Sequence, residues 1–71
     1  MTKYKFFGAP DNKQITIYSP TKNQHRPLKK GDVFTIVKRL NYAFPTSVVD
    51  IEGKRYWMRD WKIIEFCKLK D

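Results

Sequence analysis

The chain has 71 residues, of which 15 are Lys or Arg and seven are Asp or Glu, so its formal net charge is +8. A chain of this length buries only about 60% of the surface that its unfolded form exposes, so we expect one domain over residues 1–71 without a deep substrate pocket. The single cysteine, Cys67, excludes an intramolecular disulfide. No apolar run approaches the roughly 20 residues of a membrane span, and no signal peptide pattern is present. We therefore expect a cytoplasmic protein with no membrane partner.

The positive charge is concentrated in the first part of the chain. Residues 1–30 contain seven Lys or Arg and one acid, Asp11, whereas residues 31–71 contain eight against six. Residues 12–31 contain no acid. Such a basic segment attracts polyanions, although a basic surface that only keeps the protein soluble is an equal alternative.

The first half of the chain reads as short strands separated by turn residues. Residues 14–18 alternate in polarity, and 32–39 are rich in β-branched and aromatic residues, both typical of strands. A strand at 3–7 would pair with 14–18 through a turn at 10–12. The polar segment 21–27 is expected to be a connection, because prolines flank it.

Two further strands are predicted at 47–51 and 54–58. They flank Glu52-Gly53, a dipeptide that favours a tight hairpin. Five strands with little sequence between them indicate an all-β fold, a five-stranded antiparallel barrel.

The C-terminal segment has two interpretations. Trp57, Trp61 and Ile64 follow helical spacing and Asp60 is a suitable cap, which favours an α+β fold with a helix at 60–69. The β-branched and aromatic residues at 63–66 instead favour a short helical turn near 59–61 and a last strand. We prefer the second interpretation and keep the first as the alternative.

The order of these elements resembles the Src-homology-3-like (SH3-like) barrels, and bacterial members more than the polyproline-binding ones. The likeness covers roughly residues 28–66 and is carried by Leu28-Lys29-Lys30-Gly31-Asp32, Phe34, Ile36, Ile51, Gly53, Trp57-Met58 and Ile63. It implies a barrel filled by Phe34, Ile36, Val49, Ile51, Met58 and Ile63. It also implies that residues 8–27 form a long hairpin before a diverging turn at 29–31, where Gly31 would tolerate a positive φ.

The chain departs from the peptide-binding SH3 domains at their ligand groove. Ser47-Val48 stands near the position of their paired tryptophans, and Asp11 is the one acid of the hairpin. The proline that they carry after the aromatic strand is replaced around Arg59-Asp60. Because a polyproline segment docks in an aromatic-lined groove, we do not expect proline-motif recognition.

No constellation of catalytic or metal-binding residues is present. The sole histidine, His25, and Cys67 do not supply the three or four ligands of a zinc site, and no base is positioned beside a nucleophile. Asp50 and Glu52 alternate onto one strand face, where we expect the two carboxylates to be solvated or paired with Lys54 or Arg55. We therefore expect no enzyme, no cofactor and no small-molecule substrate.

The remaining function is binding. We expect a non-enzymatic module, with a monomer favoured, that contacts an acidic protein through a basic hairpin and the aromatic loop at 40–45. Its candidate binding residues are Lys22, Arg26, Lys29, Lys30, Tyr42, Phe44, Arg59 and Trp61. The alternative is a nucleic-acid-binding protein that uses the basic face of 13–30, with Lys29 and Lys30 contributing more than Lys68 and Lys70. A free-standing SH3-like chain of this size also resembles small proteins of phages and prophages.

Overall fold

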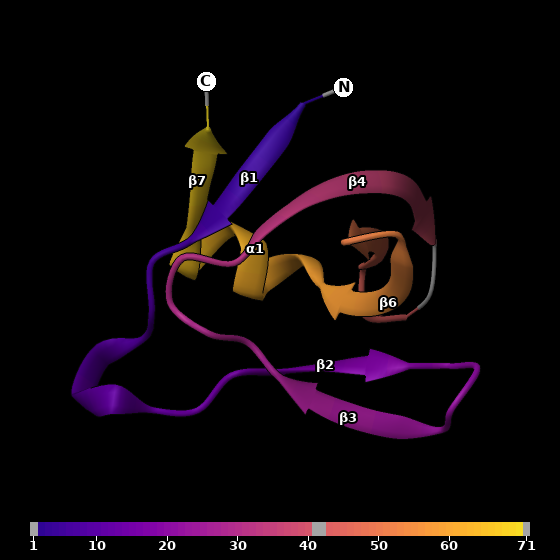
Figure 1. Cartoon of the computed structure of the whole chain (residues 1–71), viewed down its shortest axis with the longest axis horizontal. Helices are drawn as coiled ribbons and strands as arrows, with labels where there is room; N and C mark the ends of the chain where they lie inside the picture. Colours follow the sequence, from indigo (N-terminus) through magenta and orange to yellow (C-terminus); the bar gives the residue numbers. More distant parts are fainter. Residues whose placement is uncertain (1, 41–42, 71) are drawn as a thin grey trace.

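The computed structural model describes residues 2–40 and 43–70, which form a mostly β structure with one short α-helix (Figure 1). Seven strands in these residues make a single antiparallel sheet in the order β3-β2-β6-β5-β4-β1-β7, where the sequence predicted five strands. The elements are β1 (Lys3–Phe6), the 3₁₀ turn η1 (Pro10–Asn12), β2 (Thr16–Ser19), β3 (Gln24–Pro27), β4 (Val33–Leu40), β5 (Thr46–Ile51), β6 (Lys54–Arg59), α1 (Asp60–Phe66) and β7 (Cys67–Lys70).

The centre of the sheet is the β4–β5–β6 meander. Strands β5 and β6 pair from Thr46↔Arg59 to Ile51↔Lys54. Glu52 and Gly53 both have positive φ, 52° and 83°, as a two-residue hairpin turn of the primed type requires. The predicted hairpin is therefore confirmed.

The predicted pairing of the first two strands is wrong. β1 pairs with β4 and β7, whereas β2 pairs with β3 and β6. The reason lies in packing, because Phe6 is buried and the Tyr4 ring stacks on Phe34 of β4 at 5.7 Å. The residues that connect β1 to β2 form the 3₁₀ turn η1 and do not bring the two strands together.

The polar connection expected at 21–27 is also partly wrong, because residues 24–27 form β3. β3 is the outermost strand of the sheet. Pro27 is its last residue, and an edge strand tolerates proline because one side of it has no strand to bond. The resulting β2–β3 hairpin is the part of the predicted long hairpin that has regular structure.

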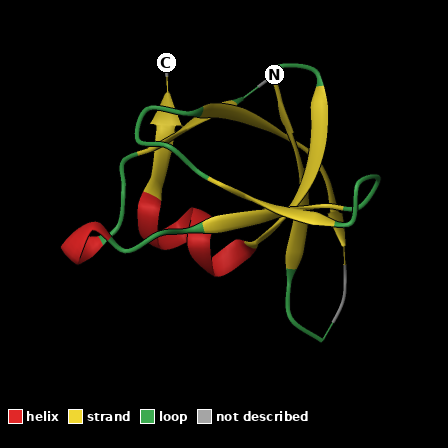
Figure 2. Cartoon of the chain, turned by 60° about the horizontal axis from the view of Figure 1, so that its bottom comes forward, coloured by secondary structure: helices red, strands yellow, loops and turns green. Residues whose placement is uncertain are grey.

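The hydrophobic core contains five of the six residues that the SH3-like resemblance predicts to fill the interior. Phe34, Val49, Ile51, Met58 and Ile63 are buried, and Ile36 is partly buried against them. The hairpin region and the strands near the chain ends add Phe6, Ile15, Ile17, Leu28 and Cys67, and β6 adds Tyr56. Figure 2 shows the strands curving around a common centre. Gly31 has the expected positive φ, 98°.

The strand expected at 63–66 is wrong, since these residues belong to α1. The alternative helix began at the right residue, but it ends at Phe66, and 67–70 form β7. Ile63 faces the core while Ile64 is exposed, so packing on one helix face overrides the β preference of the side chains. Among residues 2–40 and 43–70 no helix is long and apolar enough to cross a membrane.

Candidate functional site

A row of three rings crosses the outer face of the β2–β3 hairpin and of the neighbouring strand β6. Register places Trp57 of β6 opposite Tyr18 of β2, and Tyr18 opposite His25 of β3. The centroid of the Tyr18 ring lies 5.9 Å from that of Trp57 and 5.2 Å from that of His25. The neighbours Ile17 and Met58 are buried, so the alternation of side chains directs the three rings outward.

These rings line an open cleft of about 250 Å³ whose other walls carry two cations, Arg59 and Lys62. The Lys62 ammonium donates a hydrogen bond of 2.8 Å to the carbonyl oxygen of Thr16. Burial, and to a lesser extent the charge of Arg59, lowers the pKa of Lys62 from its ordinary value. No acid is among the described residues that line this cleft, so its chemistry suits an anionic group beside an aromatic or apolar one.

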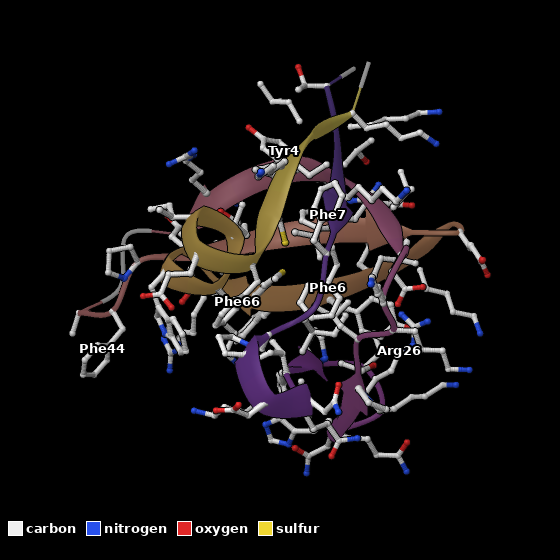
Figure 3. All side chains as sticks on the ribbon, turned by 90° about the vertical axis from the view of Figure 1, so that its left-hand side faces the viewer. Tyr4, Phe6, Phe7, Arg26, Phe44 and Phe66 are labelled. Carbon is white, nitrogen blue, oxygen red and sulfur yellow. The ribbon has the colours of Figure 1, made fainter. Side chains whose placement is uncertain are left out.

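Arg59 connects the cleft to the loop before β5. Its Nη1 donates to the Thr46 hydroxyl at 2.9 Å and to the Phe44 carbonyl at 3.3 Å. Its guanidinium also lies 5.3 Å from the centre of the Phe44 ring, which is 69% exposed. Figure 3 shows Phe44 at the outer edge of the molecule, so this candidate binding residue is accessible. Tyr42 lies outside the described residues.

Trp61 lies on α1 next to the cleft but does not line it. Its ring packs edge-on against Phe66, with 6.0 Å between centroids, and the Lys62 ammonium lies 5.7 Å from its centre. Trp61 is 48% exposed, so one part of the ring supports the helix and another remains accessible.

The basic residues of the hairpin do not converge on one site. Lys22 and Arg26 line a second cleft, of about 240 Å³, together with Lys54. Lys29 and Lys30 are exposed in the turn before β4 and line neither of these two clefts.

Arg26 is partly buried and contacts two neighbouring side chains. Its guanidinium lies 5.4 Å from the centre of the Tyr56 ring, and its Nη2 lies 3.8 Å from a carboxylate oxygen of Asp32. That same oxygen accepts a hydrogen bond of 2.9 Å from the backbone N–H of Lys29. Arg26 therefore ties β3 to the diverging turn, and we assign it a structural role.

Sequence reasoning missed Lys62, and it did not select His25, Tyr18 or Trp57 as binding residues. The polarity alternation at 14–18 assigns Tyr18 to the outer face, but the pairing of β2 with β6 is not visible in the sequence. The expected pairing of Asp50 is confirmed, since its carboxylate lies 3.0 Å from Nε of Arg55. Cys67 is buried, and burial raises the pKa of its thiol to about 11.

Comparisons with protein-family models, with curated proteins and with solved structures found no match. The function therefore rests on the chemistry of the site.

Proposed function

We propose that this protein is a non-enzymatic SH3-like binding module that holds an acidic segment of a partner protein in the ring-lined cleft. The observation that supports this most directly is the convergence of Arg59 and Lys62 beside the Tyr18 and Trp57 rings. A carboxylate of the partner would pair with the two cations, while an apolar side chain next to it would pack on the rings.

The connectivity of the described elements supports the SH3-like part of the proposal. A hairpin follows β1, a turn then starts the β4–β5–β6 meander, and a helical segment leads to β7, which returns to β1. The hairpin, the turn and the meander follow the order that the SH3-like resemblance implies, whereas the helix and the pairing of β7 with β1 lie outside that resemblance. Fold alone does not assign a ligand, so the partner is inferred from the cleft.

The dimensions and chemistry of the cleft favour a protein segment. A volume of about 250 Å³ accommodates a few side chains of an extended chain. Aromatic and Arg side chains are enriched among the residues that contribute most to protein interfaces. Arg59 uses Nη1 for its two hydrogen bonds within the chain, and a guanidinium has five N–H donors in all, so it can also bind a carboxylate.

The alternative, nucleic-acid binding by the face of 13–30, has less support. Arg26 forms an ion pair with Asp32 and lies against the Tyr56 ring, and Lys29 and Lys30 lie outside the second cleft. Lys22 and Lys54 are the remaining lysines that line that cleft among the described residues.

Selection from a library of random peptides, followed by tryptophan fluorescence titration of the selected sequences, tests the proposal. Acidic sequences with an aromatic or large apolar residue are expected. Arg59→Ala and Lys62→Ala, made as two separate variants, should each raise the Kd about tenfold or more, as the loss of a central interface residue does. Lys70→Ala removes one positive charge from β7 and should change the Kd by less than about twofold. Selection of neutral or proline-rich peptides, or equal losses in all three variants, would contradict the proposal.

A further inference from the structure

The ribbon formed by β1 and β7 places lysines directly opposite lysines. Lys3 is paired with Lys70, and Lys5 with Lys68. Residues two apart on a strand share a face, so these four residues, named here the lysine patch, lie on one side of the ribbon. Tyr4 and Phe6 point to the other side, where Tyr4 stacks on Phe34 and Phe6 is buried.

The exposed ring of Phe7 brings two of these ammonium groups together. Nζ of Lys5 lies 5.6 Å from the centre of the Phe7 ring, and Nζ of Lys68 lies 5.7 Å from it. The backbone N–H of Phe7 donates a hydrogen bond of 2.9 Å to the carbonyl of Phe66, which fixes Phe7 at the end of α1 (Figure 3). Both ammonium groups therefore lie around one ring, where cation–π attraction offsets part of the repulsion between the two like charges.

The charge of the lysine patch is not neutralised within the described chain. No carboxylate of residues 2–40 and 43–70 forms an ion pair with any of its four lysines. Asp50 and Glu52 line a shallow cleft with Lys3, and Asp50 is already paired with Arg55. The Lys5–Lys68 end, beside Phe7, therefore has the less compensated charge.

We propose that the lysine patch binds the phosphate backbone of a nucleic acid, with one phosphate seated between Lys5 and Lys68. A lysine ammonium binds phosphate as a point charge. The Lys3–Lys70 pair lies two residues away along the strands, about 7 Å, so it reaches a further phosphate of the same backbone. Contacts of this kind carry no base specificity.

Two other anionic partners fit this surface less well. A membrane surface requires apolar side chains that insert beside the lysines, but Leu69 is paired with Tyr4 on the other side of the ribbon and the Phe7 ring faces two ammonium groups. An acidic protein segment has flexible carboxylates without the fixed repeat of a phosphate backbone. The nucleic acid is therefore the partner that we infer.

This inference does not depend on the proposed function. Figures 1 and 3 place the β1–β7 ribbon and the β2–β3 hairpin at opposite ends of the molecule. β7 and β3 are also the two opposite edges of the sheet. Variants of Arg59 or Lys62 should leave nucleic-acid binding unchanged, so the failure of one proposal can be told from the failure of the other.

The test is fluorescence anisotropy with labelled DNA of about 20 base pairs, measured between about 50 and 200 mM salt. The variant Lys5→Gln with Lys68→Gln is compared with Lys29→Gln with Lys30→Gln, which removes the same charge from exposed side chains of the turn. The slope of log affinity against log salt should lie between about −2 and −4 for the wild type and become less negative by about 2 in the first variant. Its affinity at the lower salt should fall about tenfold or more, while the turn variant stays within about twofold.

Several results would overturn the inference. These are the absence of binding at low salt, an equal or larger loss in the turn variant, and tighter binding of polyglutamate or phosphatidylserine vesicles at equal anion concentration. Thermal unfolding by circular dichroism establishes that both variants are folded. If the variant with both Lys5→Gln and Lys68→Gln does not fold, Lys68→Gln alone should make the slope of log affinity against log salt less negative by about 1.

Discussion

The hydroxyl of Ser47 donates a hydrogen bond of 2.6 Å to a carboxylate oxygen of Asp60. Ser47 is fully buried on β5, and Asp60 is the first residue of α1. The backbone N–H of Asp60 also donates to the Pro45 carbonyl at 3.0 Å. These two bonds fix the start of the helix that carries Lys62, so the contact between the buried Ser47 and the partly buried Asp60 helps to set the position of one cation of the ring-lined cleft.

Ser47→Ala should lower the free energy of unfolding by about 1–2 kcal/mol, since it removes a hydrogen bond to a charged group and leaves part of the Asp60 carboxylate unsatisfied. The other partner of that carboxylate, Arg39, lies 3.6 Å away with a side chain that is 70% exposed. Arg39→Ala should therefore change the free energy by less than about 1 kcal/mol. Urea unfolding of both variants makes the comparison, and an Arg39 effect as large as that of Ser47 would show that the surface ion pair fixes the helix.

The sequence predicts the parts of this fold that depend on local patterns. The alternation at 47–51 and 54–58 and the Glu52-Gly53 turn specify a hairpin, because neighbouring residues carry all the information that it needs. The positive φ of Gly31 is predictable for the same reason.

The parts that were missed depend on contacts between distant segments. The pairing of β1 with β7 joins the two ends of the chain, so no local pattern indicates that Lys3 faces Lys70. The charge pattern of the sequence instead favours Lys29 and Lys30 over Lys68 and Lys70 for nucleic-acid binding. The preferred strand at 63–66 was wrong, and local sequence did not decide for the alternative helix because Ser47 and Pro45, which fix the first turn of α1, belong to another strand and another loop.

The pKa of Lys62 predicts how the ring-lined cleft responds to alkaline pH. Burial lowers this pKa below the ordinary value of 10.5, so the ammonium is lost earlier than that of an ordinary lysine as the pH rises. As the pH is raised, affinity for an acidic peptide should therefore begin to decrease before pH 10.5 is reached. Lys62→Arg should retain affinity to higher pH because a guanidinium stays charged. Titrations of a selected peptide between about pH 7 and pH 10 measure this. An identical pH profile for the two proteins would remove Lys62 from the binding site.

The same shift affects stability with a definite sign. The folded state holds the Lys62 proton less tightly than the unfolded state does. The free energy of unfolding should therefore rise as the pH increases from the lowered pKa of the folded state to 10.5. Lys62→Arg removes the effect and serves as the reference for urea unfolding at each pH.

Cys67 should have the opposite influence on stability. Burial raises the pKa of its thiol from 9.0 to about 11, so the folded state holds the thiol proton more tightly than the unfolded state. The contribution of Cys67 is complete below pH 9.0 and is lost as the pH rises toward 11. Cys67→Ala should be less stable near neutral pH but show a weaker decline at alkaline pH.

Labelling with iodoacetamide gives an independent measurement of Cys67. A buried protonated thiol should react slowly in the native protein and rapidly after unfolding in guanidinium chloride, because the thiolate is the reactive form. Equal labelling rates in the two conditions would show that the thiol is accessible in the folded chain.

Replacing Lys68 by Glu should separate stability from nucleic-acid binding in the lysine patch. Lys68 lies directly opposite Lys5, so Lys68→Glu converts a like-charge pair into an opposite-charge pair. Cross-strand pairs of this kind contribute roughly 0.2–1 kcal/mol, so the free energy of unfolding should rise by about that amount. The same substitution removes one phosphate contact and places a carboxylate beside the seat of the phosphate, so DNA affinity at low salt should fall about tenfold or more.

The matched control for this variant is Lys30→Glu, which changes the charge by the same amount at an exposed turn residue that has no lysine across a strand pair. Its free energy of unfolding should stay within about 0.5 kcal/mol of the wild-type value, and its DNA affinity should fall less than that of Lys68→Glu. If the lysine patch serves only to keep the protein soluble, Lys68→Glu should still increase stability, but Lys68→Glu and Lys30→Glu should lose DNA affinity equally. If the lysine patch binds phosphate, Lys68→Glu should increase stability and also lose more DNA affinity than Lys30→Glu. Both effects have one cause, because the paired positive charges of Lys5 and Lys68 repel each other and attract the phosphate.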